Sequence, residues 1–493
     1  MKSVRFFFAL LLVLSLLTVS PLVAQQPTPP PSAPQVHPEV KEALEKSLGK
    51  FNSADIEGAY DALNAVYAKH KNTMAPPRVV LARFFAAANI PQGVLNSLER
   101  GVLDMPNDPE AYILLAEVLL AQGCVTAADE LLNKADSFVN TIPDQDRRKN
   151  LTLASLRHRI GVYQNRGQWA KVAEGLQRVI QIEGRTPILL RQLAIAMFRQ
   201  DNKEAEARNL FVEANNIKSE ENANALPPDA LMSQLHLSRN KEGDRAKALS
   251  MLNDAMRAAP NSPGVLAYAV NVYLINHDLA KAKEIVSQLY EVEKKNAEGG
   301  GGLPGVRAFP TENTAKLLAQ VYLFDGNWTG AESYYQYLVV NSPNDAEAVN
   351  GLALALCEQK DPTDPSKKRP DPEKIRRAFD YAVSNVQKNE RNPALYATLG
   401  WVLYQSGRLQ EAQKALRQAS PGGNVSLDTA YYLARILADQ LPEIKDVAQK
   451  NQTHRQAYEI LKKAIESNQP FFKRSEAGKL LGDLEKNLPA ATP

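Results

Sequence analysis

The feature that most constrains this chain is a pattern of small and large apolar residues that recurs along almost its whole length. One copy consists of Tyr112, Leu115, Ala116, Leu119, Gly123, Ala128, Leu132 and Ala135. Two more copies keep the same offsets, from Ala315 to Pro343 and from Tyr396 to Ala419. Apolar residues three and four positions apart lie on one face of an α-helix, and a glycine between two such stretches permits a tight turn. The pattern therefore predicts pairs of amphipathic helices that pack on each other.

The spacing of the copies adds a second level of order. Successive copies begin 34 residues apart at every second junction and 42 to 49 residues apart at the others. Their first residues are 75, 109, 153, 187, 229, 263, 312, 346, 393 and 427. We therefore expect five pairs of units, preceded by a partial unit at Val40–Lys71 and followed by a helix from about Ser475 to Leu488. Terminal elements of this kind cover the apolar faces of the end units.

This pattern resembles that of the tetratricopeptide repeat, a 34-residue helix–turn–helix unit. The resemblance covers nearly everything from about Glu39 to about Asn487. It implies an all-α fold, namely a right-handed helix–turn–helix solenoid (superhelix) of about 11 repeats arranged largely as pairs. Together with the N-terminal residues, it points to the exported bacterial type of the family.

The N-terminal residues predict export. Lys2 and Arg5 precede an apolar run at residues 6–19, and Ala24 offers a cleavage point, which is the layout of a secretory signal peptide. The run is shorter than the ~20 apolar residues of a spanning helix. An uncleaved anchor is the alternative, because Leu22 departs from the small residue expected at its position. We expect a periplasmic or outer-membrane-associated protein, alternatively a secreted one, with no integral membrane segment after cleavage.

Composition and register together predict the domain boundaries. The prolines between Gln25 and Pro38 indicate an extended spacer, and the glycine tract that includes Gly300 indicates a flexible linker. The expected organisation is a signal peptide at 1–24, a Pro-rich spacer at 25–38, an N-terminal array at 39–295, a Gly-rich linker or hinge at 296–310, a C-terminal array at 311–474, a capping helix at 475–488 and a tail at 489–493.

Charge, glycine and cysteine content argue against several functions. Lys and Arg number 58 against 55 Asp and Glu, a net charge of +3, which gives no field suited to nucleic acid. Gly300, Gly302 and Gly305 match G-x-G-x-x-G, but a helical segment precedes them where a dinucleotide site needs a strand. Cys124 and Cys357 lie in distant units, beyond the ~7 Å limit for a disulfide. We expect two free, packed thiols.

No set of residues with a catalytic arrangement emerges. The six histidines fall in different units or in the spacer, and none forms a metal pair at helical spacing. Acids, bases and nucleophiles do not cluster in the sequence, and solvated helix faces account for the carboxylates. The sequence predicts no catalytic residue, no cofactor and no metal site, and hence a protein that is not an enzyme.

The resemblance also implies a binding surface. In tetratricopeptide proteins the first helix of each unit lines a concave groove that faces a bound peptide. Carried over by register, the groove positions are Arg83, Arg157, Arg191, Arg199, Asn271, Lys316, Phe324, Asn350, Trp401, Tyr404, Tyr431 and Arg435. Packing inside a unit does not require these residues, so arginines, asparagines and exposed aromatics there favour a bound partner. The alternative is that they merely coat the solenoid.

The expected function is a non-catalytic scaffold that binds peptide segments or protein partners in this groove in the cell envelope, with self-association left open. One alternative is a subunit of an envelope polysaccharide-export or secretion complex. Another is a carbohydrate-contacting protein that stacks sugars on Trp401, Tyr404 and Tyr431. A free C-terminus is not the expected ligand, because Asn271 lacks the matching polar partners of the family's carboxylate clamp.

Overall fold

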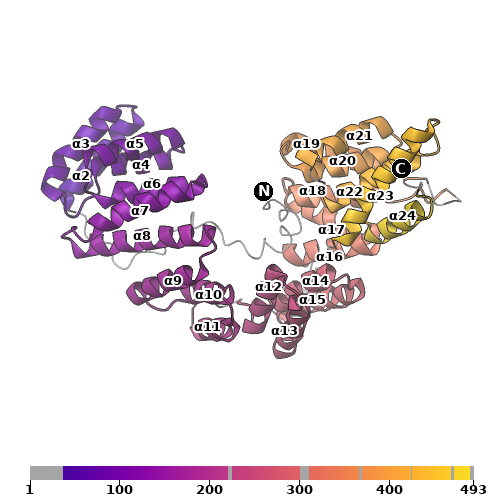
Figure 1. Cartoon of the computed structure of the whole chain (residues 1–493), viewed down its shortest axis with the longest axis horizontal. Helices are drawn as coiled ribbons and strands as arrows, with labels where there is room; N and C mark the ends of the chain where they lie inside the picture. Colours follow the sequence, from indigo (N-terminus) through magenta and orange to yellow (C-terminus); the bar gives the residue numbers. More distant parts are fainter. Residues whose placement is uncertain are drawn as a thin grey trace. The chain divides into compact units, whose positions relative to one another are not determined.

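The computed structural model describes residues 37–219, 222, 225–299, 310–364, 366, 369–423, 425–467 and 471–488. These residues form twenty-three α-helices, a short 3-10 helix at Pro421–Gly423 and one isolated antiparallel bridge between Lys360 and Pro370 (Figure 1). The predicted all-α class is confirmed.

The helices follow one another as pairs, each a hairpin, and a single helix comes last. In chain order they are α2 (Pro38–Asn52) and α3 (Ile56–His70), α4 (Pro77–Ala87) and α5 (Pro91–Asp104), α6 (Pro109–Ala121) and α7 (Val125–Val139), α8 (Gln145–Asn165) and α9 (Trp169–Glu183), α10 (Pro187–Phe198) and α11 (Glu204–Asn216), α12 (Pro228–Arg239) and α13 (Asp244–Ala258), α14 (Pro263–Ile275) and α15 (Leu279–Gly299), α16 (Glu312–Asp325) and α17 (Trp328–Asn341), α18 (Ala346–Cys357) and α19 (Pro372–Lys388), α20 (Pro393–Gln405) and α21 (Leu409–Gln418), α22 (Leu427–Gln440) and α23 (Val447–Glu466), and finally α24 (Arg474–Lys486).

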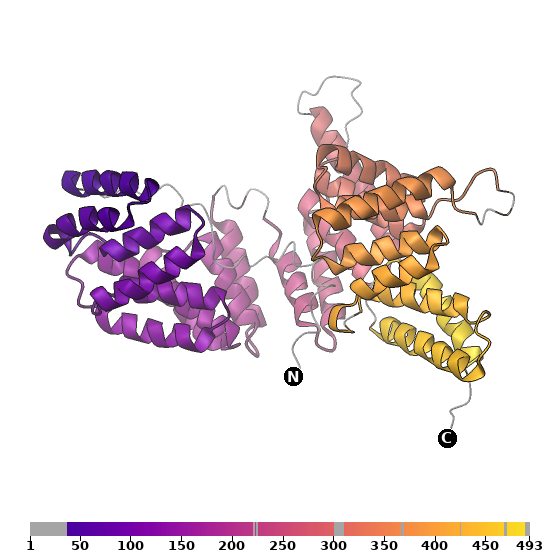
Figure 2. The ribbon, with the colours of Figure 1, turned by 90° about the horizontal axis from the view of Figure 1, so that it is seen from above.

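This order confirms the register read from the sequence. The predicted starts at residues 109, 187, 263, 312, 346, 393 and 427 are each the first residue of a helix. Most consecutive helices pack on each other, and the first helices of neighbouring hairpins also touch, as α18 does with α20 and α20 with α22. Figure 2 shows this side-by-side packing in the orange and yellow hairpins.

Local sequence explains where the helices begin and turn. Proline is the first residue of many of them, as in α6 and α20, where its missing N–H would have had no helical partner. The turn inside a hairpin needs one residue in the left-handed region. Gly123 and Gly407 supply it at φ 78°, and Asn202 and His277 do so at φ 60°.

One insertion extends a helix instead of forming a loop. The predicted start at residue 153 lies within α8, because the inserted residues 145–150 form its first turns. Arg147 in this added segment donates to Asp108 Oδ2 at 2.7 Å and to Glu110 Oε2 at 3.0 Å, and all three side chains are nearly buried. The extra turns of α8 are therefore tied to the start of α6.

The helices fall into two compact units that divide between Ala248 and Leu249, inside α13. The segment predicted as a hinge, 296–310, belongs to the second unit in sequence, and its residues 300–309 lie outside the described residues. We call the described residues 37–248 the N-terminal unit and the described residues from 249 the C-terminal unit.

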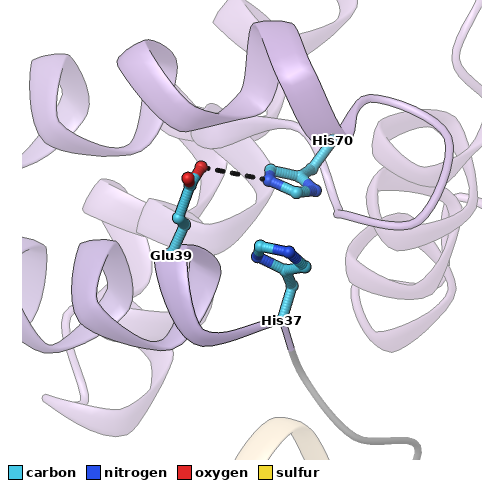
Figure 3. Close-up of side chains that lie close together, drawn as sticks. All are labelled: His37, Glu39 and His70. Carbon is cyan, nitrogen blue, oxygen red and sulfur yellow. Dashed lines mark hydrogen bonds and ion pairs between the residues drawn. The ribbon is translucent and has the colours of Figure 1, made fainter.

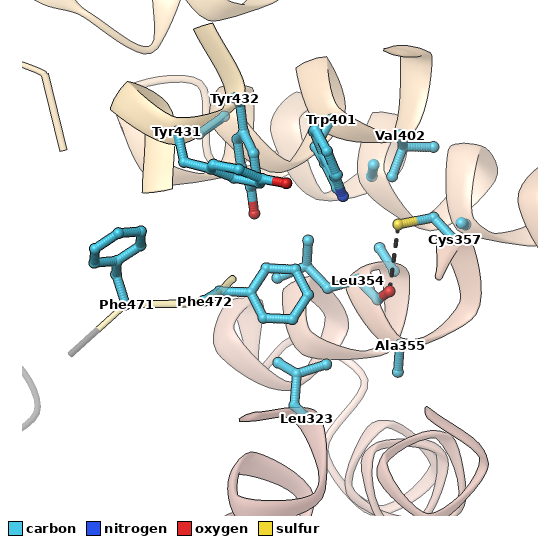
Figure 4. Close-up of a cluster of buried hydrophobic side chains, with 14 of the residues drawn as sticks. Leu323, Leu354, Ala355, Cys357, Trp401, Val402, Tyr431, Tyr432, Phe471 and Phe472 are labelled. Carbon is cyan, nitrogen blue, oxygen red and sulfur yellow. Dashed lines mark hydrogen bonds between the residues drawn. The ribbon is translucent and has the colours of Figure 1, made fainter. Parts of the chain in front are cut away.

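The C-terminal unit has an aromatic-rich core. Trp401, Tyr432 and Phe472 gather there with Leu354 and the buried thiol of Cys357 (Figure 4). The expectation of two packed thiols is therefore right for Cys357 and wrong for Cys124, which is exposed at the turn after α6.

Candidate functional site

An open pocket of ≈ 320 Å³ lies in the C-terminal unit, where α20, α22 and α24 come together. Its lining residues are Trp401, Tyr404, Gln405, Tyr431, Arg435, Lys473, Glu476, Lys479, Leu480 and Asp483. Four predicted groove residues, the three aromatics and Arg435, thus meet in one place. We call this the α24 pocket.

The aromatic residues form a packed wall of the pocket, and the expectation that they are exposed is wrong for two of them. Trp401 is 3% and Tyr431 5% exposed. The Trp401 ring stacks on Tyr404 and on Tyr432, with centroids 5.0 Å and 4.5 Å apart, and it also touches Tyr431 at 5.6 Å. The physical reason is that the next hairpin covers α20, so a groove position on one unit becomes a core position between two units (Figure 4).

A buried carboxylate holds the inner side of this wall. Trp401 Nε1 donates to Glu358 Oε1 at 2.7 Å, and the Lys473 ammonium donates to Glu358 Oε2 at 2.7 Å. The side chain of Glu358 is 4% exposed and that of Lys473 10%. A buried charge needs partners of this kind. Lys473 thereby ties the start of α24 to the end of α18.

Tyr404 forms the more accessible part of the wall. Its hydroxyl donates to Asp439, and Arg435 donates to the same carboxylate at 3.2 Å through Nε and at 2.6 Å through Nη2. Burial, and then the hydrogen bond to Asp439, raise the pKa of Tyr404 above its ordinary value. The tyrosine thus stays neutral, and the cation of Arg435 is held at the rim.

The rim of the pocket carries both signs of charge. Arg435, Lys473 and Lys479 contribute cations, and Glu476 and Asp483 contribute anions. Lys473 is bound to Glu358 and lies 3.3 Å from Glu476, whereas Lys479 is exposed. A polar rim around an apolar wall is the usual anatomy of a protein interface.

In the N-terminal unit, the predicted arginines already have partners from neighbouring helices. Arg83 pairs with Glu110 at 2.6 Å and Arg157 with Glu183 at 2.5 Å. Arg191 donates to Asn215 at 3.2 Å and also to Asn222. Arg199 lies 5.4 Å from the centre of the Trp169 ring, and its pKa is lowered by burial and by the charge of Arg239. These contacts brace neighbouring helices.

The other predicted positions lie outside the α24 pocket. Lys316 pairs with Asp345 at 2.9 Å, and the amide of Asn271 bonds to the Ala267 carbonyl of its own helix at 3.2 Å. Phe324 is partly buried against the core of the C-terminal unit, and Asn350 is half-buried.

Sequence reasoning missed the residues that α24 contributes. Lys473, Glu476, Lys479 and Asp483 lie in or beside a helix that was predicted only as a cap. The repeat register stops before α24, so it assigns these residues no groove position. Their alternating charges are the one signal that sets this helix face apart.

A second open pocket of ≈ 590 Å³ lies among α13, α14 and α15. It includes Asn253 and Tyr273, which share a 3.1 Å hydrogen bond, together with Arg257 and Lys281. No predicted groove residue lines it.

The succession of hairpins defines a helical-repeat protein of the all-α class. Residues 316–364, which span most of α16, all of α17 and α18 and the loop that follows, match the family model of the tetratricopeptide repeat. This stretch therefore matches the tetratricopeptide repeat, a fold whose proteins in general serve as non-catalytic interaction scaffolds.

Solved structures with some likeness to this chain include a tetratricopeptide-repeat protein from Parabacteroides merdae, at 13% identity and TM-score 0.39, covering 68% of this chain and 98% of that one. A human IFIT1 dimer with m7Gppp-AAAA has 15% identity and TM-score 0.40, covering 79% and 85%. Yeast Tom70 has 12% identity and TM-score 0.34, covering 91% and 95%. Likenesses this low carry no argument about partners. No curated protein matches the chain.

Among the described residues, no helix is both long enough and apolar enough to cross a bilayer.

Proposed function

We propose that this chain is a non-catalytic scaffold of the cell envelope that binds a peptide segment of a partner protein at the α24 pocket. The observation that carries the proposal is the convergence of Trp401, Tyr404, Tyr431 and Arg435, all chosen as groove positions from the sequence, in one open pocket. Helix α24 closes one side of this pocket and adds charges of both signs.

The size and chemistry of the pocket indicate what it binds. A volume of ≈ 320 Å³ is at the lower end of the ~300–1,000 Å³ of small-molecule sites, so it takes one or two side chains of a longer segment. The accessible part of the Tyr404 ring suits an apolar side chain, and the exposed cation of Lys479 suits a neighbouring carboxylate. Contacts spread over other units would add affinity by multivalency.

Envelope location is part of the proposal and is supported by the N-terminal sequence. Residues 1–24 have the layout of a secretory signal, and the Pro-rich residues 25–38 would separate the array from it. These residues, up to 36, lie outside the described residues. A subunit of an envelope polysaccharide-export or secretion complex would be one form of such a scaffold.

The carbohydrate alternative has less support. A sugar-stacking platform needs an exposed ring face, but Trp401 is 3% exposed and stacks on two tyrosines. Tyr404 alone offers part of a ring, which is little surface for a glycan.

The test is a peptide selection on the purified full chain, followed by affinity measurements on two charge-reversal variants. Lys479→Glu changes an exposed residue of the pocket rim, and Lys450→Glu makes the same change at an exposed residue of α23 outside the pocket. We expect the first to weaken binding of the selected peptides by about tenfold, which is about 1.4 kcal/mol. The second should leave it unchanged.

Equal effects of both variants would mean that binding follows overall charge and not the pocket. Unchanged binding by Lys479→Glu, combined with crosslinks from a photoreactive residue that map elsewhere, would remove the α24 pocket as the binding site.

A further inference from the structure

Two histidines that are far apart in the sequence lie side by side at the start of the array. His37 precedes the first turn of α2, which contains Glu39, and His70 is the last residue of α3. Because α2 and α3 form an antiparallel hairpin, the beginning of one helix lies beside the end of the other. Figure 3 shows the three side chains turned toward one another. The sequence placed His37 in the spacer and His70 in the first unit, so it gave no reason to pair them.

The distances suit a metal site better than a hydrogen-bonded cluster. One ligand atom from each of His37, Glu39 and His70 lies within 4.8 Å of the other two. His70 Nε2 is 3.5 Å from Glu39 Oε2, longer than the usual 2.7–3.2 Å of a hydrogen bond. The two imidazole rings are only 4.5 Å apart between centroids, and the described residues give the His37 ring no hydrogen bond.

We propose that His37, Glu39 and His70 bind a divalent transition-metal ion, with Zn²⁺ as the best match. Two imidazoles and one carboxylate are a common zinc ligand set, and the fourth position stays open to water. Bonds of about 2.0–2.2 Å to a tetrahedral ion put ligand atoms roughly 3.3 Å apart, so small side-chain rotations complete the site. Mg²⁺ and Ca²⁺ prefer all-oxygen ligands and fit poorly.

The surroundings of the site leave these ligands available. The Oε2 atom of Glu39, which faces His70, is also approached by the Lys69 ammonium. Lys69 lies 3.5 Å from the same oxygen and is 69% exposed. Its ammonium competes with the metal for Glu39 and can swing into solvent when the ion binds.

A bound ion would fasten the end of the array. Helix α2 is the first helix of the described chain; it buries Val40, Ala43 and Ser47 and packs the partly buried Leu44 and Phe51 against the neighbouring core. An end hairpin of a repeat array frays most readily, because it has one neighbour instead of two. A metal shared between α2 and α3 would oppose this opening without touching the α24 pocket.

The test is zinc titration calorimetry on the full chain, purified without a polyhistidine tag. We expect one Zn²⁺ site in the wild type and no response to Mg²⁺. His37→Ala and His70→Ala should each weaken Zn²⁺ binding by about 100-fold or more, since even outer partners of metal ligands contribute 10- to 100-fold. Circular dichroism of each variant checks that the helices are retained.

Two further variants serve as controls. His158→Ala removes a histidine that lies 3.7 Å from Glu117 but has no second imidazole in the site, so binding should not change. Lys69→Gln removes the competing cation, so binding should stay equal or become tighter.

The rate of amide hydrogen exchange in α2 tests the same proposal independently of calorimetry. Zn²⁺ at 100 times its Kd should slow exchange in α2 by up to about 100-fold in the wild type and not in His70→Ala. The proposal is overturned if the wild type binds no Zn²⁺. It is equally overturned if binding survives the loss of both histidines, or if α2 exchanges at the same rate with and without the ion.

Discussion

Trp401 offers the sharpest test of the packing around the α24 pocket. Its ring is 3% exposed and stacks on Tyr404 and Tyr432, and its Nε1 donates to the buried Glu358. Truncating a buried tryptophan to alanine costs about 3–5 kcal/mol. Because the change also leaves one oxygen of Glu358 without its donor, we expect Trp401→Ala to lie near the top of that range, at about 5 kcal/mol.

The assay is urea unfolding of the full chain followed by far-ultraviolet circular dichroism. Repeat arrays unfold in parts, so hydrogen exchange of α18, α20 and α22 should accompany it to locate the loss. Trp401→Phe separates the two contributions: it keeps most of the apolar ring and loses the hydrogen bond to a charged acceptor, which is worth about 1.5–3 kcal/mol. Trp169→Ala, in the N-terminal unit, is the matched control and should leave exchange in α20 unchanged.

The reasoning would be refuted if Trp401→Ala lowered the free energy of unfolding by less than about 1 kcal/mol, well below the ~3–5 kcal/mol cost of truncating a buried aromatic ring. If Trp401→Phe were as stable as the wild type, the hydrogen bond to Glu358 would contribute nothing to the free energy of unfolding. Equal protection of α20 in the wild type and in Trp401→Ala would show that the ring does not support this helix.

Two other predictions concern titratable groups of the described chain. Burial raises the pKa of Asp428 from 3.8 to about 7, so between these values the unfolded chain releases a proton that the folded chain keeps. The contribution of Asp428 to the free energy of unfolding should therefore fall as pH rises from about 4 to 7. Asp428→Asn should stabilise the protein at pH 8 by up to about 4 kcal/mol and have little effect near pH 3. Equal effects of this variant in urea unfolding at both pH values would contradict the prediction. Cys124 is exposed and should react with a thiol reagent in the native protein. Burial raises the pKa of the Cys357 thiol, so this thiol should react only after unfolding. Two fast-reacting thiols in the native protein would show that the packing described for α18 is wrong.

The fold could be predicted from the sequence because its dominant signal is local and periodic. The apolar spacing and turn glycines of each unit specify a hairpin by themselves, so starts such as 109, 263 and 393 coincide with helix starts. Helix α8 begins before the predicted unit start at residue 153, because the inserted residues that precede this position are also helical and form the first turns of α8.

The candidate site was predictable only in part. Register identifies which face of a helix a residue occupies, but it does not say whether a later hairpin covers that face. Trp401 and Tyr431 illustrate this, since both occupy groove positions and both are buried between hairpins. The contributions of α24 and the pairing of His37 with His70 depend on contacts between segments that follow no repeat, and only the three-dimensional structure brings them together.

The bond between Lys473 and Glu358 limits how such an array can evolve. Repeat proteins lengthen and shorten by duplicating or losing whole units, which works where every junction is interchangeable. Lys473 and Glu358 are 115 positions apart, and both side chains are nearly buried. A unit gained or lost between them would separate the pair and leave a buried carboxylate short of its cation. The Lys473–Glu358 bond therefore disfavours the gain or loss of a unit between α18 and α24, and changes in repeat number should be better tolerated upstream of α18.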